Sequence, residues 1–147
     1  MFGLAENGKY VSFAETIAPS TVYRFPVERL EKFLLNNPGI QEGFLVKAVH
    51  DLRNAQRQII VMGRYDIPRR LAAFLLDSSA HERYFDEANQ VLTLPMSRYD
   101  IADYLGTSAE TITRAFGRLE ADGMIRRATA RSVELRVPGL KAFLLLD

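Results

Sequence analysis

Residues 94–125, LPMSRYDIADYLGTSAETITRAFGRLEADGMI, contain two short helical patterns separated by a glycine. Ser97 is a good N-cap for a first helix over residues 98–105, because its hydroxyl can accept a hydrogen bond from the first turn. Gly106 follows that helix, and glycine easily takes the left-handed conformation found where helices end. The stretch therefore predicts a capped helix followed by a tight turn.

A second helix is predicted over residues 109–121. Thr107 or Ser108 can cap it, and Thr107 with Glu110 fits the spacing of a capping box. Gly123 stands where this helix would end. Two helices joined by a tight turn that contains glycine form a helix-turn-helix. The residues expected to pack between the two helices are the small Ala102 and the larger Ile101, Leu105, Ile112, Phe116 and Leu119.

A β-hairpin is predicted directly after the second helix. Residues 124–127 are followed by a small turn, and in residues 132–137 valine and leucine then alternate with charged side chains. Alternation with a period of two is typical of a half-buried strand. The hairpin would be the wing of a winged helix-turn-helix, and three arginines gather there: Arg126, Arg127 and Arg131.

The second predicted helix has a polar face opposite its apolar one. Glu110, Thr113 and Arg114 lie on adjacent turns of that face. In the major groove of DNA, arginine can bond to guanine, glutamate can accept from cytosine and threonine can contact thymine. Taken singly, Glu110 fits an acid near the positive end of the helix dipole, and Arg114 fits a solvated side chain. Within a complete helix-turn-helix and wing, we interpret all three as base-reading residues.

Residues 39–62 predict one long helix without an internal proline. Apolar side chains recur along it at alternating intervals of four and three, which is the a/d pattern of a coiled coil. A helix that faces the core of a globular fold would give the same pattern in a segment of this length. We favour a dimer interface, because the period holds over about three heptads. The predicted interface residues are Leu45, Ala48, Leu52, Ala55, Ile59 and Met62.

The remaining segments predict short elements. Helices are expected over Val27–Leu35 and Ile67–Ser79, and a strand over Val91–Leu94. Tyr10–Ala18 and Thr21–Phe25 are rich in β-branched and aromatic residues, which favour extended chain. Because two strands alone are not a stable sheet, they would belong to a larger β structure or pack on the helices.

The composition excludes several kinds of site. The 147 residues include no cysteine, so disulfides, thiolate metal sites and cysteine nucleophiles are excluded within this chain. His50 and His81 are the two histidines, and their wide separation argues against a zinc site. No Ser/His/Asp grouping or phosphate-binding glycine loop supports an enzyme. We therefore expect no metal, no cofactor and no enzymatic activity in this chain.

Because the chain is nearly neutral overall, any positively charged surface for nucleic acid must be confined to part of it. Lys and Arg total 19 against 18 Asp and Glu, a net charge of +1. Only four of the 19 basic residues are lysine, and arginine is the side chain suited to bidentate phosphate and guanine contacts. No apolar run approaches the roughly 20 residues that span a bilayer, and the N-terminus lacks the pattern of a secretory signal. A cytoplasmic location without a membrane partner is expected.

On these residues the chain resembles the Crp/Fnr family of bacterial transcription regulators. Residues 94–125 resemble its DNA-binding domain, and RRLAAFLLDSS, residues 69–79, resembles the helix after its hinge. Residues 38–62 lie where the family has its dimerisation helix. Residues 1–35 resemble the last strands of its β-roll sensor domain and the short helix that follows.

The resemblance implies a homodimer that binds a two-fold symmetric site in double-stranded DNA, with TTGAT-like half-sites. The segment ETITR, Glu110–Arg114, is similar to the E-x-x-S-R pattern of the Fnr/FixK branch, with Thr113 in place of serine. Glu110 and Arg114 would read the step that contains the G·C pair, and Thr113 would contact a neighbouring thymine. Residues 82–90 match the surface that the family presents to RNA polymerase. The positions expected to contact phosphate are Ser97, Arg98, Ser108 and Thr111, with Arg127 and Arg131 at the wing.

The expected fold is mainly α with small β parts. Residues 1–35 would be a remnant of the cyclic-nucleotide-binding-like β-roll, residues 36–63 the dimerisation coiled-coil helix, and residues 64–147 the winged helix-turn-helix domain. Because most of the β-roll is missing, we hypothesise that the chain is a fragment or a truncated form of a longer regulator.

Several positions depart from the cyclic-AMP receptor branch of the family. Ala109 stands where that branch has a base-reading arginine. Ala55 and Gln56 stand where it has the hydroxyl pair that touches cyclic AMP, so cyclic AMP is not expected. The cysteines that hold an iron–sulfur cluster in Fnr lie mostly upstream of this chain. The effector of any longer parent protein is therefore left open.

A protein-interaction module is the alternative hypothesis. In that case the coiled-coil helix pairs with a partner, and the winged domain binds protein instead of DNA. Such a module has no need of the exposed triplet Glu110, Thr113 and Arg114 beside the wing arginines. We therefore favour a sequence-specific DNA-binding transcription regulator.

Overall fold

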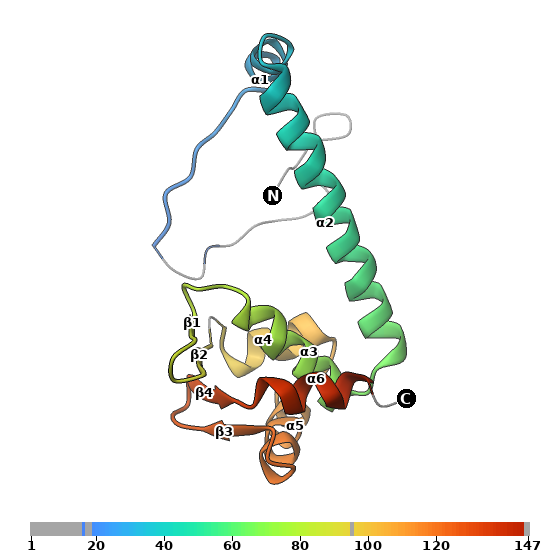
Figure 1. The fold of residues 1–147 in the computed structure, drawn as a ribbon, viewed down its shortest axis with the longest axis vertical. Coiled ribbons are helices and arrows are strands. Elements are labelled where there is room, and N and C mark those ends of the chain that lie inside the picture. The colour runs from blue at the N-terminus through green and yellow to red at the C-terminus, as the bar shows by residue number, and fades with distance from the viewer. Residues whose placement is uncertain (1–15, 17–18, 95, 146–147) are drawn as a thin grey trace. The chain divides into compact units, whose positions relative to one another are not determined.

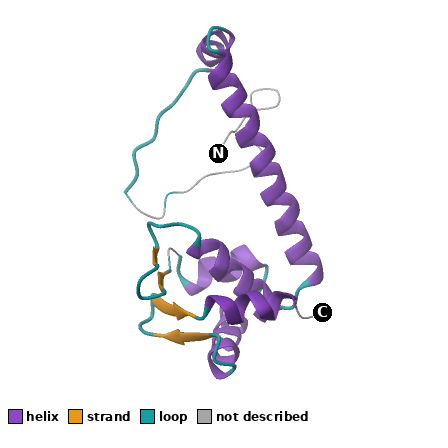
Figure 2. Cartoon of the chain, viewed as in Figure 1, coloured by secondary structure: helices purple, strands orange, loops and turns teal. Residues whose placement is uncertain are grey.

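The computed structural model describes residues 16, 19–94 and 96–145, and this part of the chain is mainly helical (Figures 1 and 2). The small sheet is antiparallel, which confirms the predicted fold class. By contact, the chain divides into two compact units, residues 1–43 and 44–147. The elements follow in the order α1 (Val27–Leu35), α2 (Pro38–Arg64), α3 (Ile67–Ser79), β1 (Phe85–Asp86), β2 (Val91–Thr93), α4 (Arg98–Leu105), α5 (Ala109–Ala121), β3 (Ile125–Arg127), β4 (Ser132–Leu135) and α6 (Val137–Leu145).

The first unit contains α1 and the beginning of α2. The side-chain amide of Asn36 donates to the Lys32 carbonyl at 2.8 Å and helps to end α1. The chain over Thr21–Phe25, where a strand was predicted, is irregular, so that prediction is wrong for these residues. A strand requires a partner for its backbone groups, and no strand among the described residues pairs with this segment. Apart from Thr16, the predicted strand Tyr10–Ala18 lies outside the described residues.

The second unit has one apolar core, formed by α3, α4, α5, α6 and the sheet. The residues predicted to pack between α4 and α5 are buried there, and Phe116 is the largest of the fully buried side chains. Ala102, on α4, is 2% exposed, as a close crossing of two helices requires. The predicted core of the helix-turn-helix is therefore confirmed: Ile101, Ala102, Leu105, Ile112, Phe116 and Leu119 are all buried.

The sheet has the strand order β1-β2-β4-β3, with antiparallel pairing throughout. Strands β3 and β4 form the predicted hairpin next to α5, and Arg126 pairs with Glu134 across it. Strand β2 pairs with the other edge of β4, where Leu92 lies opposite Val133. The wing is therefore tied into the core by a strand that precedes the helix-turn-helix in the sequence.

The last helix differs from the prediction. The strand expected to reach Val137 ends at Leu135, and α6 begins at Val137. Val137 continues the alternation of the strand by coincidence, and Pro138 suits the first turn of a helix. Helix α6 packs on α3 and contributes the fully buried Leu140 to the core. The Tyr65 hydroxyl donates to the Leu144 carbonyl at 3.2 Å.

Gly106 provides the backbone conformation on which the turn between α4 and α5 depends. Its φ of 66° lies in the left-handed region, where a side chain is strained. A Cβ at this position would also lie 3.1 Å from Met62 Cε, at the end of α2. The backbone conformation therefore favours glycine here, and any side chain would also require Met62 Cε to move by a few tenths of an ångström.

We predict that Gly106→Ala destabilises the fold by about 1–2 kcal/mol, the cost of a left-handed residue with a side chain. Chemical denaturation followed by circular dichroism measures this change. Gly117→Ala is the matched control, because Gly117 lies inside α5 with open space around it. That control should gain about 0.5–1 kcal/mol, and equal stability changes in the two variants would contradict the prediction.

Candidate nucleic-acid interface

The helix-turn-helix is held by side-chain caps at the beginning of each helix. Ser97 and Asp100 form a reciprocal capping box at the start of α4, with N···O distances of 3.2 and 2.8 Å. The Ser97 hydroxyl holds the pKa of the Asp100 carboxyl below its usual value. Ser108 caps α5 by accepting from the Thr111 amide at 3.3 Å. Of the two predicted caps, Thr107 and Ser108, it is Ser108 that caps α5. The predicted capping box of Thr107 with Glu110 is therefore wrong.

Glu110, Thr113 and Arg114 are all exposed on the first half of α5, opposite the buried Ile112 and Phe116. Arg114 Nη2 donates to Thr111 Oγ1 at 3.0 Å, which keeps the guanidinium along the helix surface. The Thr113 hydroxyl donates to the Ala109 carbonyl at 2.8 Å. The three side chains therefore form one solvent-facing set near the helix N-terminus.

The surroundings of Glu110 favour the charged form of its carboxyl group. Its carboxylate accepts from its own backbone amide and from the Ser108 hydroxyl, and Arg114 lies nearby. Each of these lowers the pKa of Glu110 below its usual value. The face consequently presents a carboxylate acceptor and a guanidinium donor, one helical turn apart.

Two of the wing arginines have acidic partners within the chain. Arg127 donates to Glu120 of α5 through its amide at 2.8 Å and through Nε at 2.7 Å, and this lowers the pKa of Glu120. Arg126 Nε donates to Glu134 across the hairpin at 2.9 Å. The bond from Arg127 to Glu120 fixes the wing against α5, a link that the sequence reasoning missed because the two residues are seven apart and on different elements.

Arg98, which was predicted to contact phosphate, is half-buried against α5. Its guanidinium carbon lies 3.4 Å from the centre of the Phe116 ring, and its Nη1 is buried without a hydrogen-bond partner. Burial, and then the charge of Arg127, lowers the pKa of Arg98. Arg98 thus supports α5 from the start of α4.

The other residues predicted to contact phosphate lie nearer to solvent. Ser108, Arg127 and Arg131 are exposed, and Ser97 and Thr111 are half-buried. Arg131 lies between β3 and β4, where its amide donates to the Thr129 hydroxyl at 3.1 Å. These side chains come from the beginnings of α4 and α5 and from the wing.

The predicted dimer residues follow one stripe of α2. All of them are exposed to solvent except Met62, which is half-buried. Leu45, Leu52 and Ile59, one heptad apart, are 65%, 59% and 71% exposed. Ala48 and Ala55, between them, are exposed as well. Met62 is half-buried and lies next to Gly106 of the turn. The apolar stripe therefore has no partner within the described part of the chain, except at its C-terminal end.

The loop matched to the polymerase surface forms a small hairpin. Residues 82–90 include β1 and a tight turn, in which Asp86 accepts from the backbone and side-chain amides of Asn89 at 3.1 and 2.8 Å. The Asn89 side chain, and then its amide, lowers the pKa of Asp86. Gln90 takes a φ of 54° to complete the turn.

Across residues 16, 19–94 and 96–145, His, Asp and Glu side chains nowhere gather in threes as a metal site would need. None of the helices in that part of the chain has the length and apolar character needed to cross a membrane.

Comparison with known proteins agrees with this geometry. Residues 69–143 match the family described as the Crp-like helix-turn-helix domain. The nitrogen fixation regulation protein FixK of Bradyrhizobium diazoefficiens is 32% identical over 123 residues, which cover 84% of this chain and 52% of that protein. FixK of Rhizobium meliloti is 31% identical over 138 residues, 94% of this chain and 60% of that protein.

A solved structure of a FixK protein is also similar to this chain. FixK2 from Bradyrhizobium japonicum aligns with a TM-score of 0.69 and 32% identity, over 78% of this chain and 57% of that one. The chain spans about half of the FixK relative from Bradyrhizobium diazoefficiens, whose matched portion is 52% of its length. Because the family match covers more than half of this chain and includes its winged helix-turn-helix, the protein belongs to the Crp/Fnr family of transcription regulators, in its FixK-like branch.

Proposed function

We propose that this chain is a sequence-specific DNA-binding transcription regulator that acts as a homodimer on a two-fold symmetric, TTGAT-like site. The observation that carries the proposal is the exposed set of Glu110, Thr113 and Arg114 at the N-terminal end of a capped α5. A helix in the major groove reads base edges with its N-terminal side chains. The relatives that match are named as regulators, which supports the same function.

Each of the three side chains has a distinct partner in a TTGAT half-site. Arg114 bonds bidentately to guanine, and Glu110 accepts from the amino group of the paired cytosine. The Thr113 hydroxyl already donates to the Ala109 carbonyl, so its methyl group is free to contact a thymine methyl. The set therefore recognises a G·C pair beside thymine.

The surrounding polar side chains orient the helix on the duplex. Ser97, Ser108 and Thr111 lie at the beginnings of α4 and α5, where backbone amides and the helix dipole favour phosphate. Arg127 and Arg131 approach the backbone from the wing. Arg98 also contacts phosphate in this proposal, and it must leave the Phe116 ring to do so.

The homodimer forms through α2. The stripe of Leu45, Leu52 and Ile59 repeats every seven residues and exposes apolar surface that a second copy would bury. The alanines between these residues allow close approach of two helices. A two-fold dimer matches a palindromic DNA site, because each copy places one α5 in one half-site.

RNA polymerase is the further partner that we propose, through the hairpin of residues 82–90. Its turn is held by the hydrogen bonds between Asp86 and Asn89, so it presents a fixed polar surface. A cytoplasmic location follows from these partners.

Replacing Arg114 with Ala should abolish the preference for the palindrome TTGAT-N4-ATCAA over a scrambled duplex, at a cost of about 1–3 kcal/mol. Fluorescence anisotropy at one fixed, moderate salt concentration measures both affinities, because phosphate contacts vary steeply with salt. The matched control is Arg118→Ala, since Arg118 lies one turn further along α5 and faces Asp66 at 3.8 Å. If the unmutated protein binds both duplexes equally, the proposed function is wrong.

Replacing Leu52 with Asp should convert the dimer to a monomer, because a charged residue would be buried in the centre of the interface. Sedimentation equilibrium measures the mass, and the affinity for the palindrome should fall with it. Val46→Asp serves as the control: Val46 is 63% exposed on α2 but lies outside the heptad stripe. A dimer mass that survives Leu52→Asp would contradict the interface.

A further inference from the structure

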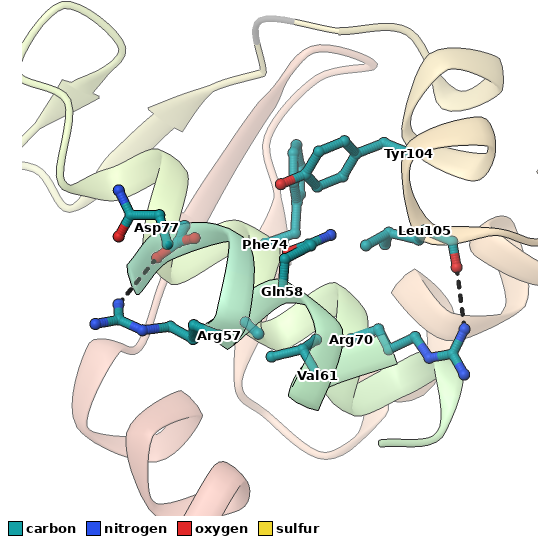
Figure 3. A pocket seen from close by; sticks show the side chains of 10 residues that line it. Arg57, Gln58, Val61, Arg70, Phe74, Asp77, Tyr104 and Leu105 are labelled. Carbon is teal, nitrogen blue, oxygen red and sulfur yellow. Dashed lines mark hydrogen bonds and ion pairs between the residues drawn. The ribbon is translucent and has the colours of Figure 1, made fainter. Parts of the chain in front are cut away.

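Arg70 connects three segments of the second unit with one guanidinium group. It lies on α3, and its Nη2 donates to the Met62 carbonyl in the last turn of α2 at 2.7 Å. Its Nε donates to the carbonyl of Tyr65, between α2 and α3, at 2.9 Å. Its Nη1 donates to the carbonyl of Leu105, the last residue of α4, at 3.2 Å (Figure 3).

These acceptors are groups that need an outside donor. The last carbonyls of a helix have no amide four residues further on, and they carry the negative end of the helix dipole. A guanidinium suits them, because it is always charged and holds five N–H donors in one plane. Arg70 therefore caps the C-termini of α2 and α4 at the same time, and holds the two helix ends together.

Side-chain packing leaves a small hollow where α2, α3 and α4 meet beside Arg70. Val61 of α2, Phe74 of α3 and Tyr104 of α4 line a small cavity of about 40 Å³, and Arg70 is also in its lining (Figure 3). The Phe74 and Tyr104 rings meet at 5.6 Å between their centres on one side of it. Because a hollow of this size has room for water, side-chain packing does not by itself hold α2 against α4, and the hydrogen bonds of Arg70 become more important for the angle between them.

We propose that Arg70 is a positioning residue that sets the spacing between half-sites that the dimer accepts. The inference rests on the proposed function, in which α2 forms the dimer and α4–α5 reads the DNA. The two α5 helices of a dimer must stand about 34 Å apart to enter successive major grooves. Since Arg70 fixes the end of α4 to the end of α2, it fixes where each α5 stands relative to the dimer axis.

The experiment compares three palindromes by anisotropy: TTGAT-N4-ATCAA, and the same half-sites with the spacer one base pair shorter or longer. We expect the unmutated chain to prefer one spacer. In Arg70→Met, which keeps the length of the stem but removes every donor, that preference should fall by roughly tenfold. The preference for TTGAT over scrambled half-sites, and the dimer mass, should be retained. Arg57→Met is the matched control, because Arg57 borders the same cavity and faces Asp77 at 4.0 Å.

Each remaining outcome would overturn the proposal. If Arg70→Met weakens binding to all three duplexes equally, Arg70 has only a structural role. If the unmutated chain distinguishes half-sites but not spacers, the spacing proposal fails while the proposed function stands. If it distinguishes neither, both fail. Should Arg70→Met not fold, Arg70→Lys replaces it with the same expected loss of spacer preference, because an ammonium cannot hold two helix ends in one plane.

Discussion

The burial of one face of α5 is the constraint on which the interface depends. Ile112, Phe116 and Leu119 are fully buried, and the helical period then requires the base-reading candidates to face outward. The same Phe116 ring receives the Arg98 guanidinium from α4, so the two helices are joined by an aromatic ring as well as by aliphatic packing. Rotation of α5 would expose the large apolar ring of Phe116, which is why the polar set has one orientation.

The hydroxyl caps and the proposed phosphate contacts use the same residues without conflict. Ser108 accepts the Thr111 amide, yet a hydroxyl has a second lone pair and one proton. The Ser108 and Thr111 oxygens lie 3.1 Å apart, and either hydroxyl can donate to the other. The hydroxyl that does not donate within this pair can turn its own proton toward a phosphate, which for Ser108 means leaving the Glu110 carboxylate. The side chains that begin α5 can therefore hold the helix and touch the duplex together. In the proposed complex, capping orients these donors before DNA binds, which lowers the entropy lost on binding.

The sequence predicted the parts of this fold whose signals are local. Ser97 and Gly106 gave both ends of α4 from cap chemistry, and the apolar period gave the core of α4 and α5. Helix α6 was missed because a continuous apolar run has no helical period, and Val137 happened to extend the alternation of β4. The bonds of Arg70 and of Arg127 join residues on different elements, so no spacing rule could reveal them. The sequence therefore predicts most of the helices and strands, but not the hydrogen bonds by which charged side chains connect them.

The net charge of the protein is +1, and two arginines of the wing are paired with acidic side chains. In the proposed function, this pairing limits how much the wing adds to the affinity for DNA. Arg126 and Arg127 already bond to Glu134 and Glu120, so a phosphate must compete with a carboxylate for each of them. Exchanging one ion pair for another gains less than pairing a free arginine, and the phosphate contribution to affinity is reduced accordingly. In the proposed function, discrimination between DNA sequences then depends mainly on base contacts from the exposed face of α5. The ion pair of Arg127 with Glu120 would still serve that discrimination, because it holds the wing against the helix proposed to read the bases.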